Sequence, residues 1–382
     1  MIDDWILPLY KIYSDDEDIQ LITKIIKRGN NWAIGPEVVE LEKQLSDFLG
    51  VRYCCVLNSG TSALHATLLA YEIGLQDEVI VPSFSFIATA NSVLFVGANP
   101  IFSDIEEQTF GLDPKSVKKQ ISANTKAIMP MDYGGLSCDI FSLKEISKEN
   151  NIFLIEDAAE SLGSTVKGRN VGTVSDAAIF SFCGNKVITT GEGGAVVTNS
   201  EKIFKKISLI RSHGRIDTKS YFNNPSASIY ESLGYNWRMS SITAALGIAQ
   251  LHKLNKIIKM RQNNANFISS RLSNTEKIKI PTTPENYSHI YQMYTIQLDS
   301  KETRDKLQEF LLNKKIFSKV YFSPIHLTKF YQNKLKSKKY YLPRTESIAE
   351  KVLTLPLYPN MTLEEMNYLI DSVNEFFENN YK

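Results

Sequence analysis

The sequence lacks the features that mark a metal cage, a membrane span or a nucleic-acid partner. Its four cysteines, Cys54, Cys55, Cys138 and Cys183, include no CxxC pair. No apolar run approaches the roughly 18–20 residues that span a bilayer, and the opening MIDDWILPLYK has no basic segment followed by an apolar signal-peptide core. The 43 basic and 42 acidic residues nearly cancel. We therefore expect a cytoplasmic protein with free thiols, no metal and no nucleic-acid or membrane partner.

Short apolar runs alternate with helical patterns between about residues 50 and 250. The runs predicted as strands are YCCVL, EVIVP, NPIFSDI, KAIMPM, NIFLIED, AAIFSF and GGAVVTN, and helical spacing recurs in 62–74, 141–151 and 201–212. This alternation predicts a mostly parallel sheet covered on both faces. A short Gly-rich piece separates the last two runs, so we expect one antiparallel strand there.

The pattern changes after about residue 250. A long helical stretch over 244–272 leads to strand material at 288–298 and a helix at 303–315. The final helix begins near Thr362, which forms a predicted capping box with Glu365. The 382 residues exceed the usual size of one domain, so the expected organisation is a large α/β domain over 1–255, including an N-terminal arm, and a small α+β domain over 256–382.

A first candidate ligand site follows the strand at 53–57, where Asn58-Ser59-Gly60-Thr61-Ser62 leads into a helix. Gly60 permits a tight turn, and the free amides of a first helical turn attract a phosphate. Simple helix capping by Ser and Thr would explain the same residues.

A second candidate lies at the end of the strand over 151–157, which delivers Glu156 and Asp157, with Glu160 one turn later. A buried carboxylate needs a partner, and a protonated pyridine nitrogen would serve. Ligation of Mg²⁺ or helix capping would account for these acids equally well.

The third candidate is Lys186, presented by the Gly184-Asn185 turn after the strand at 177–182 and followed by TTGEGG. Partial burial lowers the pKa of a lysine, which is what an imine-forming lysine requires. A solvated lysine on a surface hairpin is the alternative. GEGG does not have the GxGxxG spacing of a dinucleotide fingerprint.

The order SGT, PSFSF, EDAAE, SFCGNK with TTGEGG, then GYNWRM resembles the DegT/DnrJ/StrS family of sugar aminotransferases, which depend on pyridoxal 5′-phosphate (PLP). NNWAIGPEVVELEKQLSDFLGV and LPLYPNMTLEEM extend the resemblance over nearly the whole chain. It implies the α/β fold of PLP fold type I, with a mostly parallel central sheet and a smaller C-terminal α+β domain.

The resemblance gives three residues a role at the cofactor's ring. Lys186 should form the imine with PLP and then move the proton between the amino donor and the cofactor. Asp157 should pair with the pyridine nitrogen. Glu160 should contact the ring hydroxyl, where other members carry Gln or His.

Further cofactor contacts are implied around the phosphate and the ring face. Ser181 and the amides of Gly60 and Thr61 should hold the phosphate. Phe86 should stack on the ring, although a core phenylalanine is the alternative. Asn236 matches a residue that the family supplies from the neighbouring subunit, which implies a homodimer with shared active sites.

The substrate pocket is expected from two other segments. Trp32 with Ile34 resembles an N-terminal substrate loop, and Tyr321 and His326 resemble the sugar-pocket segment. A structural role is the alternative for His326, since it stands close to a proline.

The GNK sequence is similar to that of perosamine-synthase-like members, which aminate C4 of a nucleotide-linked 4-keto-6-deoxy sugar. Two departures from that pattern are expected to face the sugar: Lys319-Val320 in place of Arg-Pro, and Asp132 in place of His.

The implied reaction moves the amino group of L-glutamate to a nucleotide-linked keto-sugar for lipopolysaccharide, O-antigen or other surface-glycan synthesis. A PLP-dependent sugar dehydratase is one alternative, but dehydratases of this family have His where this chain has Lys186. A non-catalytic, ligand-binding regulator is another, and no DNA-binding module or basic stripe supports it.

Overall fold

The computed structural model describes residues 5–216, 229–272, 277–334 and 339–380. The helices of these ranges are α1 (Asp16–Arg28), α2 (Pro36–Leu49), α3 (Gly60–Ala70), α4 (Ile87–Phe95), α5 (Pro114–Gln120), α6 (Ile140–Glu149), α7 (Glu201–Ile210), α8 (Ser241–His252), α9 (Leu254–Leu272), α10 (Lys301–Asn313), α11 (Lys329–Lys334), α12 (Pro343–Lys351) and α13 (Leu363–Asn380). Within the described ranges, no helix combines the length and the apolar character needed to cross a bilayer.

The strands form three sheets. They are β1 (Tyr53–Leu57), β2 (Glu78–Pro82), β3 (Asn99–Ser103), β4 (Thr125–Ile128), β5 (Phe153–Asp157), β6 (Thr165–Val166), β7 (Arg169–Asn170), β8 (Ala177–Ser181), β9 (Gly194–Thr198), β10 (Ile278–Lys279), β11 (Tyr287–Ser288), β12 (Tyr294–Leu298) and β13 (Val352–Leu355).

The central sheet has seven strands in the order β1-β9-β8-β5-β4-β2-β3. β8, β5, β4, β2 and β3 pair in parallel, and β9 runs antiparallel to both of its neighbours, β1 and β8. The predicted mostly parallel sheet with one antiparallel strand is therefore confirmed. Each of its seven strands lies within, or within one residue of, a predicted apolar run.

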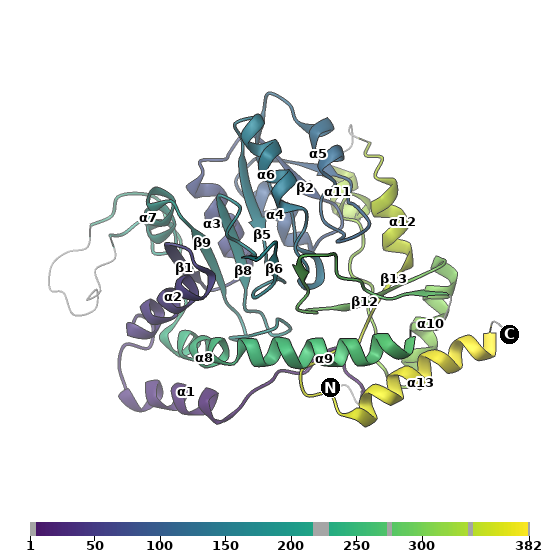
Figure 1. The fold of residues 1–382 in the computed structure, drawn as a ribbon. Helices are drawn as coiled ribbons and strands as arrows, with labels where there is room; N and C mark the ends of the chain where they lie inside the picture. Colours follow the sequence, from purple (N-terminus) through teal and green to yellow (C-terminus); the bar gives the residue numbers. More distant parts are fainter. Residues whose placement is uncertain (1–4, 217–228, 273–276, 335–338, 381–382) are drawn as a thin grey trace.

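Both faces of this sheet are buried, which explains why its strands are apolar throughout rather than alternating. In β1, Cys55 and Leu57 face one cluster, formed with α3, α4 and α7. Cys54 and Val56 face the other, formed with α2 and α8. Figure 1 shows the helices lying on either side of the sheet, with α8 and α9 end to end below its strands in this view.

A separate hydrophobic cluster surrounds the three-stranded sheet β10-β12-β13 and its helices α9, α10 and α13. Leu7 of the N-terminal segment packs into this cluster and pairs with Ile316. The helical stretch predicted over 244–272 is divided at Lys253, whose ammonium is held by Asp18 at 2.7 Å. The two-domain division stays a prediction, and its boundary at 255/256 falls in the first turn of α9.

The capping box predicted at the last helix is confirmed. The Thr362 N–H donates to Glu365 Oε2 at 2.9 Å, and the Glu365 N–H donates to Thr362 Oγ1 at 3.1 Å. These reciprocal bonds satisfy two N–H groups at the start of α13 and fix where it begins.

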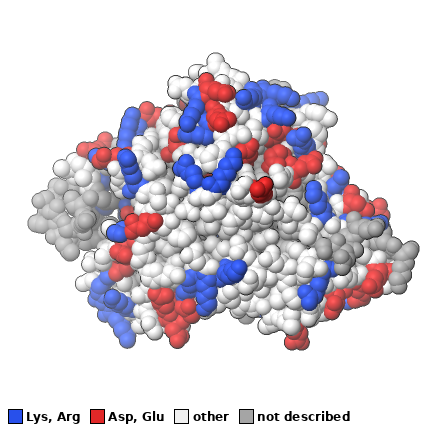
Figure 2. Space-filling view, viewed as in Figure 1, with Lys and Arg blue, Asp and Glu red and all other residues white. Residues whose placement is uncertain are grey.

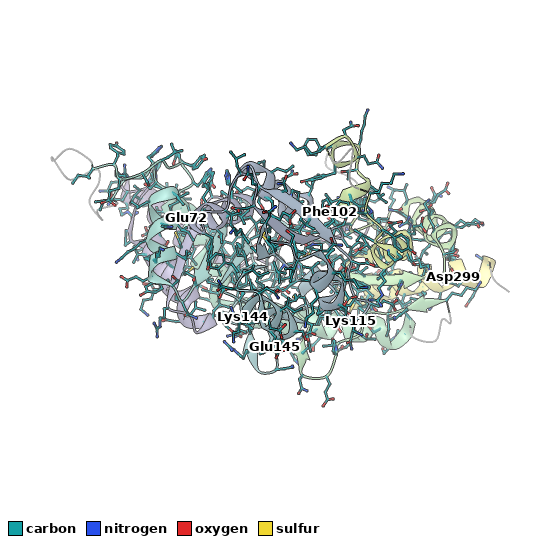
Figure 3. The ribbon with its side chains drawn as sticks, turned by 90° about the horizontal axis from the view of Figure 1, so that it is seen from above. Glu72, Phe102, Lys115, Lys144, Glu145 and Asp299 are labelled. Atoms are coloured by element: carbon teal, nitrogen blue, oxygen red, sulfur yellow. The ribbon has the colours of Figure 1, made fainter. Side chains whose placement is uncertain are left out.

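Charged side chains lie mainly around the outside of the molecule. Seen from above, Phe102 of β3 is buried, whereas Glu72, Lys115, Glu145 and Asp299 are exposed around it (Figure 3). On the face drawn in Figure 2, blue and red side chains surround a broad central area that shows few of either.

Candidate active site

One cavity of about 400 Å³ collects the segments that follow the carboxyl ends of β1, β2, β5 and β8. Ligands of open α/β sheets bind at this end of the strands. Seven of the predicted cofactor residues line the cavity together: Gly60, Thr61, Phe86, Asp157, Glu160, Ser181 and Lys186.

The start of α3 approaches the end of β8 very closely. Ser59 caps this helix by accepting a hydrogen bond from the Ser62 N–H at 3.1 Å. A Cβ atom placed on Gly60 would lie 3.0 Å from Ser181 Cβ and 3.2 Å from Ser181 Oγ. The bare backbone of Gly60 therefore lets the start of α3 approach Ser181 closely, which brings helix-start amides and a hydroxyl together, the environment that a phosphate prefers.

Asp157 is buried at the floor of the cavity. Its Oδ2 accepts a hydrogen bond from Thr89 Oγ1 at 2.7 Å, and its Oδ1 accepts one from the Ala159 N–H at 3.2 Å. Burial raises the pKa of Asp157, while the Thr89 hydroxyl, the Ala159 N–H and the charge of Lys186 lower it. A cationic partner in the cavity would relieve the cost of burying this charge.

Lys186 and Glu160 form an ion pair inside the cavity. Lys186 Nζ lies 3.1 Å from Glu160 Oε1, and the two side chains are 14% and 7% exposed. Glu160 Oε2 accepts the Gly134 N–H at 3.0 Å, which orients the carboxylate. The predicted solvent-shielded lysine is thus present, rather than a lysine on an open hairpin.

Aromatic and cationic side chains also line the cavity. Phe86 lines the cavity and is 58% exposed, so its ring is not a core residue. Tyr321 and Lys319 also line it, with Lys319 Nζ 4.8 Å from the Tyr321 ring centroid. Tyr321 and Lys319 therefore share the cavity with the predicted cofactor residues, and their contact with a sugar stays a prediction.

Four predicted residues lie outside this cavity. Trp32 and Asn236 are exposed and do not line this cavity. Ile34 lines a different groove, beside α7. His326 is buried, with its Nδ1 2.6 Å from Ser83 Oγ and its Nε2 3.3 Å from Glu346 Oε1. These contacts favour the structural alternative for His326, and its predicted contact with substrate stays a prediction.

The expectation that Asp132 faces the sugar is wrong. Asp132 is fully buried, and its Oδ1 accepts the Cys138 N–H at 2.9 Å. Asp132 does not line the cavity, and its neighbouring carboxyl group is that of Glu156.

Sequence reasoning missed two contributors to the site, Thr89 and the backbone of Gly134. Thr89 lies in the first turn of α4, three residues after Phe86 in the same motif, which is the signal that could have identified it. Gly134 has a φ of 63°, a left-handed conformation that glycine adopts without strain. Its contact with Glu160 joins residues 26 apart, which no local pattern reveals.

Comparison with known proteins decides the family. A model of the DegT/DnrJ/EryC1/StrS aminotransferase family matches residues 13–374. The chain belongs to this family. GDP-perosamine synthase of Vibrio cholerae is 32% identical over 97% of this chain and 99% of its own length. The structure of Helicobacter pylori PseC, an aminotransferase of pseudoaminic acid biosynthesis, superposes with a TM-score of 0.91 at 28% identity, covering 98% of this chain and 99% of that one.

The PLP form of the Streptococcus pneumoniae protein Spr1654 superposes with a TM-score of 0.89 at 26% identity, covering 98% of this chain and 99% of that one. The chain is therefore a PLP-dependent sugar aminotransferase with the expected α/β fold of PLP fold type I.

The cavity residues fit PLP on structural grounds. Gly60, Thr61 and Ser181 line the cavity together, and backbone amides at a helix start beside a hydroxyl suit a phosphate group. The buried, raised-pKa carboxyl of Asp157 suits a protonated ring nitrogen, and the shielded Lys186 amine suits an imine.

Replacing Gly60 with alanine should weaken PLP binding by about tenfold, because the new methyl group would crowd Ser181 where the phosphate is expected. Titration of the cofactor-free protein with PLP, followed by absorbance, measures the change. Gly74→Ala is the matched control, since its backbone is not left-handed, a Cβ there would meet only Val96 O at an ordinary 3.7 Å, and Gly74 does not line the cavity. Unchanged PLP affinity in Gly60→Ala would show that the phosphate binds elsewhere.

Proposed function

We propose that this sugar aminotransferase takes its amino group from L-glutamate and transfers it to the ketone of a nucleotide-linked 4-keto-6-deoxy sugar. The observation that carries the proposal is the convergence of Lys186, Asp157 and Glu160 on one cavity at the carboxyl ends of the strands. PLP supplies the electron sink for carbanion chemistry when it is bound. The other tasks belong to side chains of the chain itself.

Lys186 is the proton carrier in this proposal. Its amine would take the proton from the α-carbon of the amino donor and hold it at Nζ for return later in the reaction. Glu160 holds the Lys186 amine in place through the 3.1 Å contact. The Asp157 carboxylate would keep the ring nitrogen protonated, because its negative charge stabilises a positive charge buried beside it.

The acceptor class is supported by the other side chains that line the cavity. Lys319 and Lys186 are the cationic side chains among the described residues lining the cavity. With Lys186 engaged at the cofactor, Lys319 remains to attract an anion, and the Tyr321 and Phe322 rings provide apolar surface for a deoxy sugar. Relatives named GDP-perosamine synthase support a nucleotide-linked sugar.

The proposal includes a homodimer in the cytoplasm. Asn236 and Trp32 are exposed and lie away from this chain's own cavity, which is consistent with their serving a neighbouring subunit's site. The sparsely charged central area in Figure 2 is consistent with a face that a second copy covers. The product would enter lipopolysaccharide, O-antigen or another surface glycan.

Transfer of labelled nitrogen tests the proposal. The PLP-loaded enzyme is incubated with ¹⁵N-labelled L-glutamate and a panel of 4-keto-6-deoxy sugars linked to GDP, UDP or dTDP. We expect one of these to gain a labelled amino group, detected by mass spectrometry, and none to do so with Lys186→Ala. Formation of 2-oxoglutarate without a labelled sugar from any nucleotide would contradict the keto-sugar part of the proposal.

A further inference from the structure

Two buried carboxyl groups lie directly behind Asp157, on adjoining strand ends. Glu156 precedes Asp157 in β5, so its side chain points to the opposite face of the sheet. Asp132 lies just beyond β4, and its N–H donates to the Asp157 carbonyl at 3.1 Å. Met131 and Asp157 form a parallel bridge between these ends. The backbone that carries Asp157 is thus tied to the backbone that carries Asp132.

In each of these two carboxyl groups, one oxygen accepts hydrogen bonds and the other has no donor. Asp132 Oδ1 accepts the Cys138 N–H, while Glu156 Oε2 accepts the Gly172 N–H at 3.1 Å and Ser175 Oγ at 2.7 Å. Asp132 Oδ2 and Glu156 Oε1 are buried and have no donor. The two carboxyl groups lie close enough for each to shift the pKa of the other.

Ionised carboxylates can only accept hydrogen bonds, so two ionised groups would leave two buried oxygens unsatisfied and would repel each other. One proton between the two oxygens removes both costs, because a protonated carboxyl donates. We propose that Asp132 and Glu156 share one proton, and that this carboxyl pair is a positioning device for Asp157. The positioning part rests on the proposed role of Asp157, whereas the shared proton does not.

The surroundings favour Asp132 as the group that keeps the proton. Burial and then the charge of Glu156 raise the pKa of Asp132 well above its usual range. Burial also raises the pKa of Glu156, against which the Ser175 hydroxyl, the contact with Asp132 and the Gly172 N–H act. The other titratable groups facing the pair are the buried thiol of Cys138, with Asp139 and Tyr287 beyond it.

The sign of the pH dependence follows. A carboxyl whose pKa is higher in the folded than in the unfolded chain adds stability that is fully present below the unfolded value, 3.8 for Asp132. That stability is lost as pH rises toward and through the raised pKa. Above it, two buried charges face each other behind Asp157.

Infrared difference spectra of the cofactor-free protein test for the shared proton. At neutral pH we expect the C=O stretch of a protonated carboxyl in the wild type. Asp132→Asn and Glu156→Gln should each abolish this same band, because an amide in either position donates to the remaining ionised carboxylate. Asp157→Asn serves as the control, because this variant should keep the band of the Asp132–Glu156 pair. A band that persists in both variants, or two different bands lost separately, would overturn the shared proton.

Retention of PLP at alkaline pH tests the positioning role. Asp132→Asn cannot ionise, so we expect it to bind PLP about tenfold more tightly than the wild type at a pH above the pair's titration. If Asp132→Asn and Glu156→Gln fold but lose PLP at the same pH as the wild type, the positioning role is overturned. A wild type that binds no PLP at any pH would instead overturn the proposed function, and the infrared band would still report on the shared proton.

Discussion

Lys186→Ala should lower the rate of amino transfer by at least about 10³-fold, since it removes both the imine and the proton carrier. The change should spare the fold, because Lys186 lies on a turn at the cavity and its ion pair with Glu160 is local. Single-turnover reaction of the PLP-loaded protein with L-glutamate, followed by absorbance, measures the effect. The variant should also bind PLP without the absorbance band of a lysine imine.

Lys319→Ala is the matched control for this result, because Lys319 is also a lysine that lines the cavity. It should keep the imine band and the proton-transfer step with glutamate, and lose affinity mainly for the anionic sugar substrate. Equal losses of the imine band in both variants would show that neither lysine was identified correctly. Full activity in Lys186→Ala would contradict the assignment of Lys186 directly.

Asp157→Asn should weaken PLP binding by about 10- to 100-fold, the value of a hydrogen bond to a charged group. The substitution preserves shape, so the contact with Thr89 can remain while the counter-charge for the ring nitrogen disappears. The rate of donor proton removal should fall as well, since an unprotonated ring withdraws electrons less strongly. Titration with PLP and single-turnover rates measure the two effects separately.

Glu192→Gln provides the control for Asp157→Asn. Glu192 is a carboxyl that lines the same cavity but is exposed rather than buried. Its replacement should change PLP affinity by less than about threefold, because solvent screens its charge. A larger loss of PLP affinity in Glu192→Gln than in Asp157→Asn would contradict the assignment of Asp157 and indicate that Glu192 pairs with the ring nitrogen.

Local sequence pattern predicted the central sheet well because each strand is short, apolar and bounded by turn residues. The run YCCVL became β1 residue for residue, and GGAVVTN became the antiparallel β9. The division between α8 and α9 was not predicted, since apolar spacing continues through Lys253. That residue is held by acids of the N-terminal segment more than 230 positions away.

The candidate site was predictable where one motif supplies a group to one strand end, as with Gly60, Asp157 and Lys186. It was not predictable where function depends on a contact between motifs. Asp132 was expected in the sugar pocket, but it lies beneath the sheet end with Glu156. His326 is held by Ser83, 243 residues away, a partnership that has no local signal.

The most direct test of the central claim is an absorbance spectrum of the purified protein with PLP, recorded before and after addition of L-glutamate. The account predicts the band of a protonated lysine imine, which fades as the band of pyridoxamine phosphate grows. It also predicts that the first band is absent from Lys186→Ala. Folded wild-type protein that shows no imine band with PLP would contradict the account.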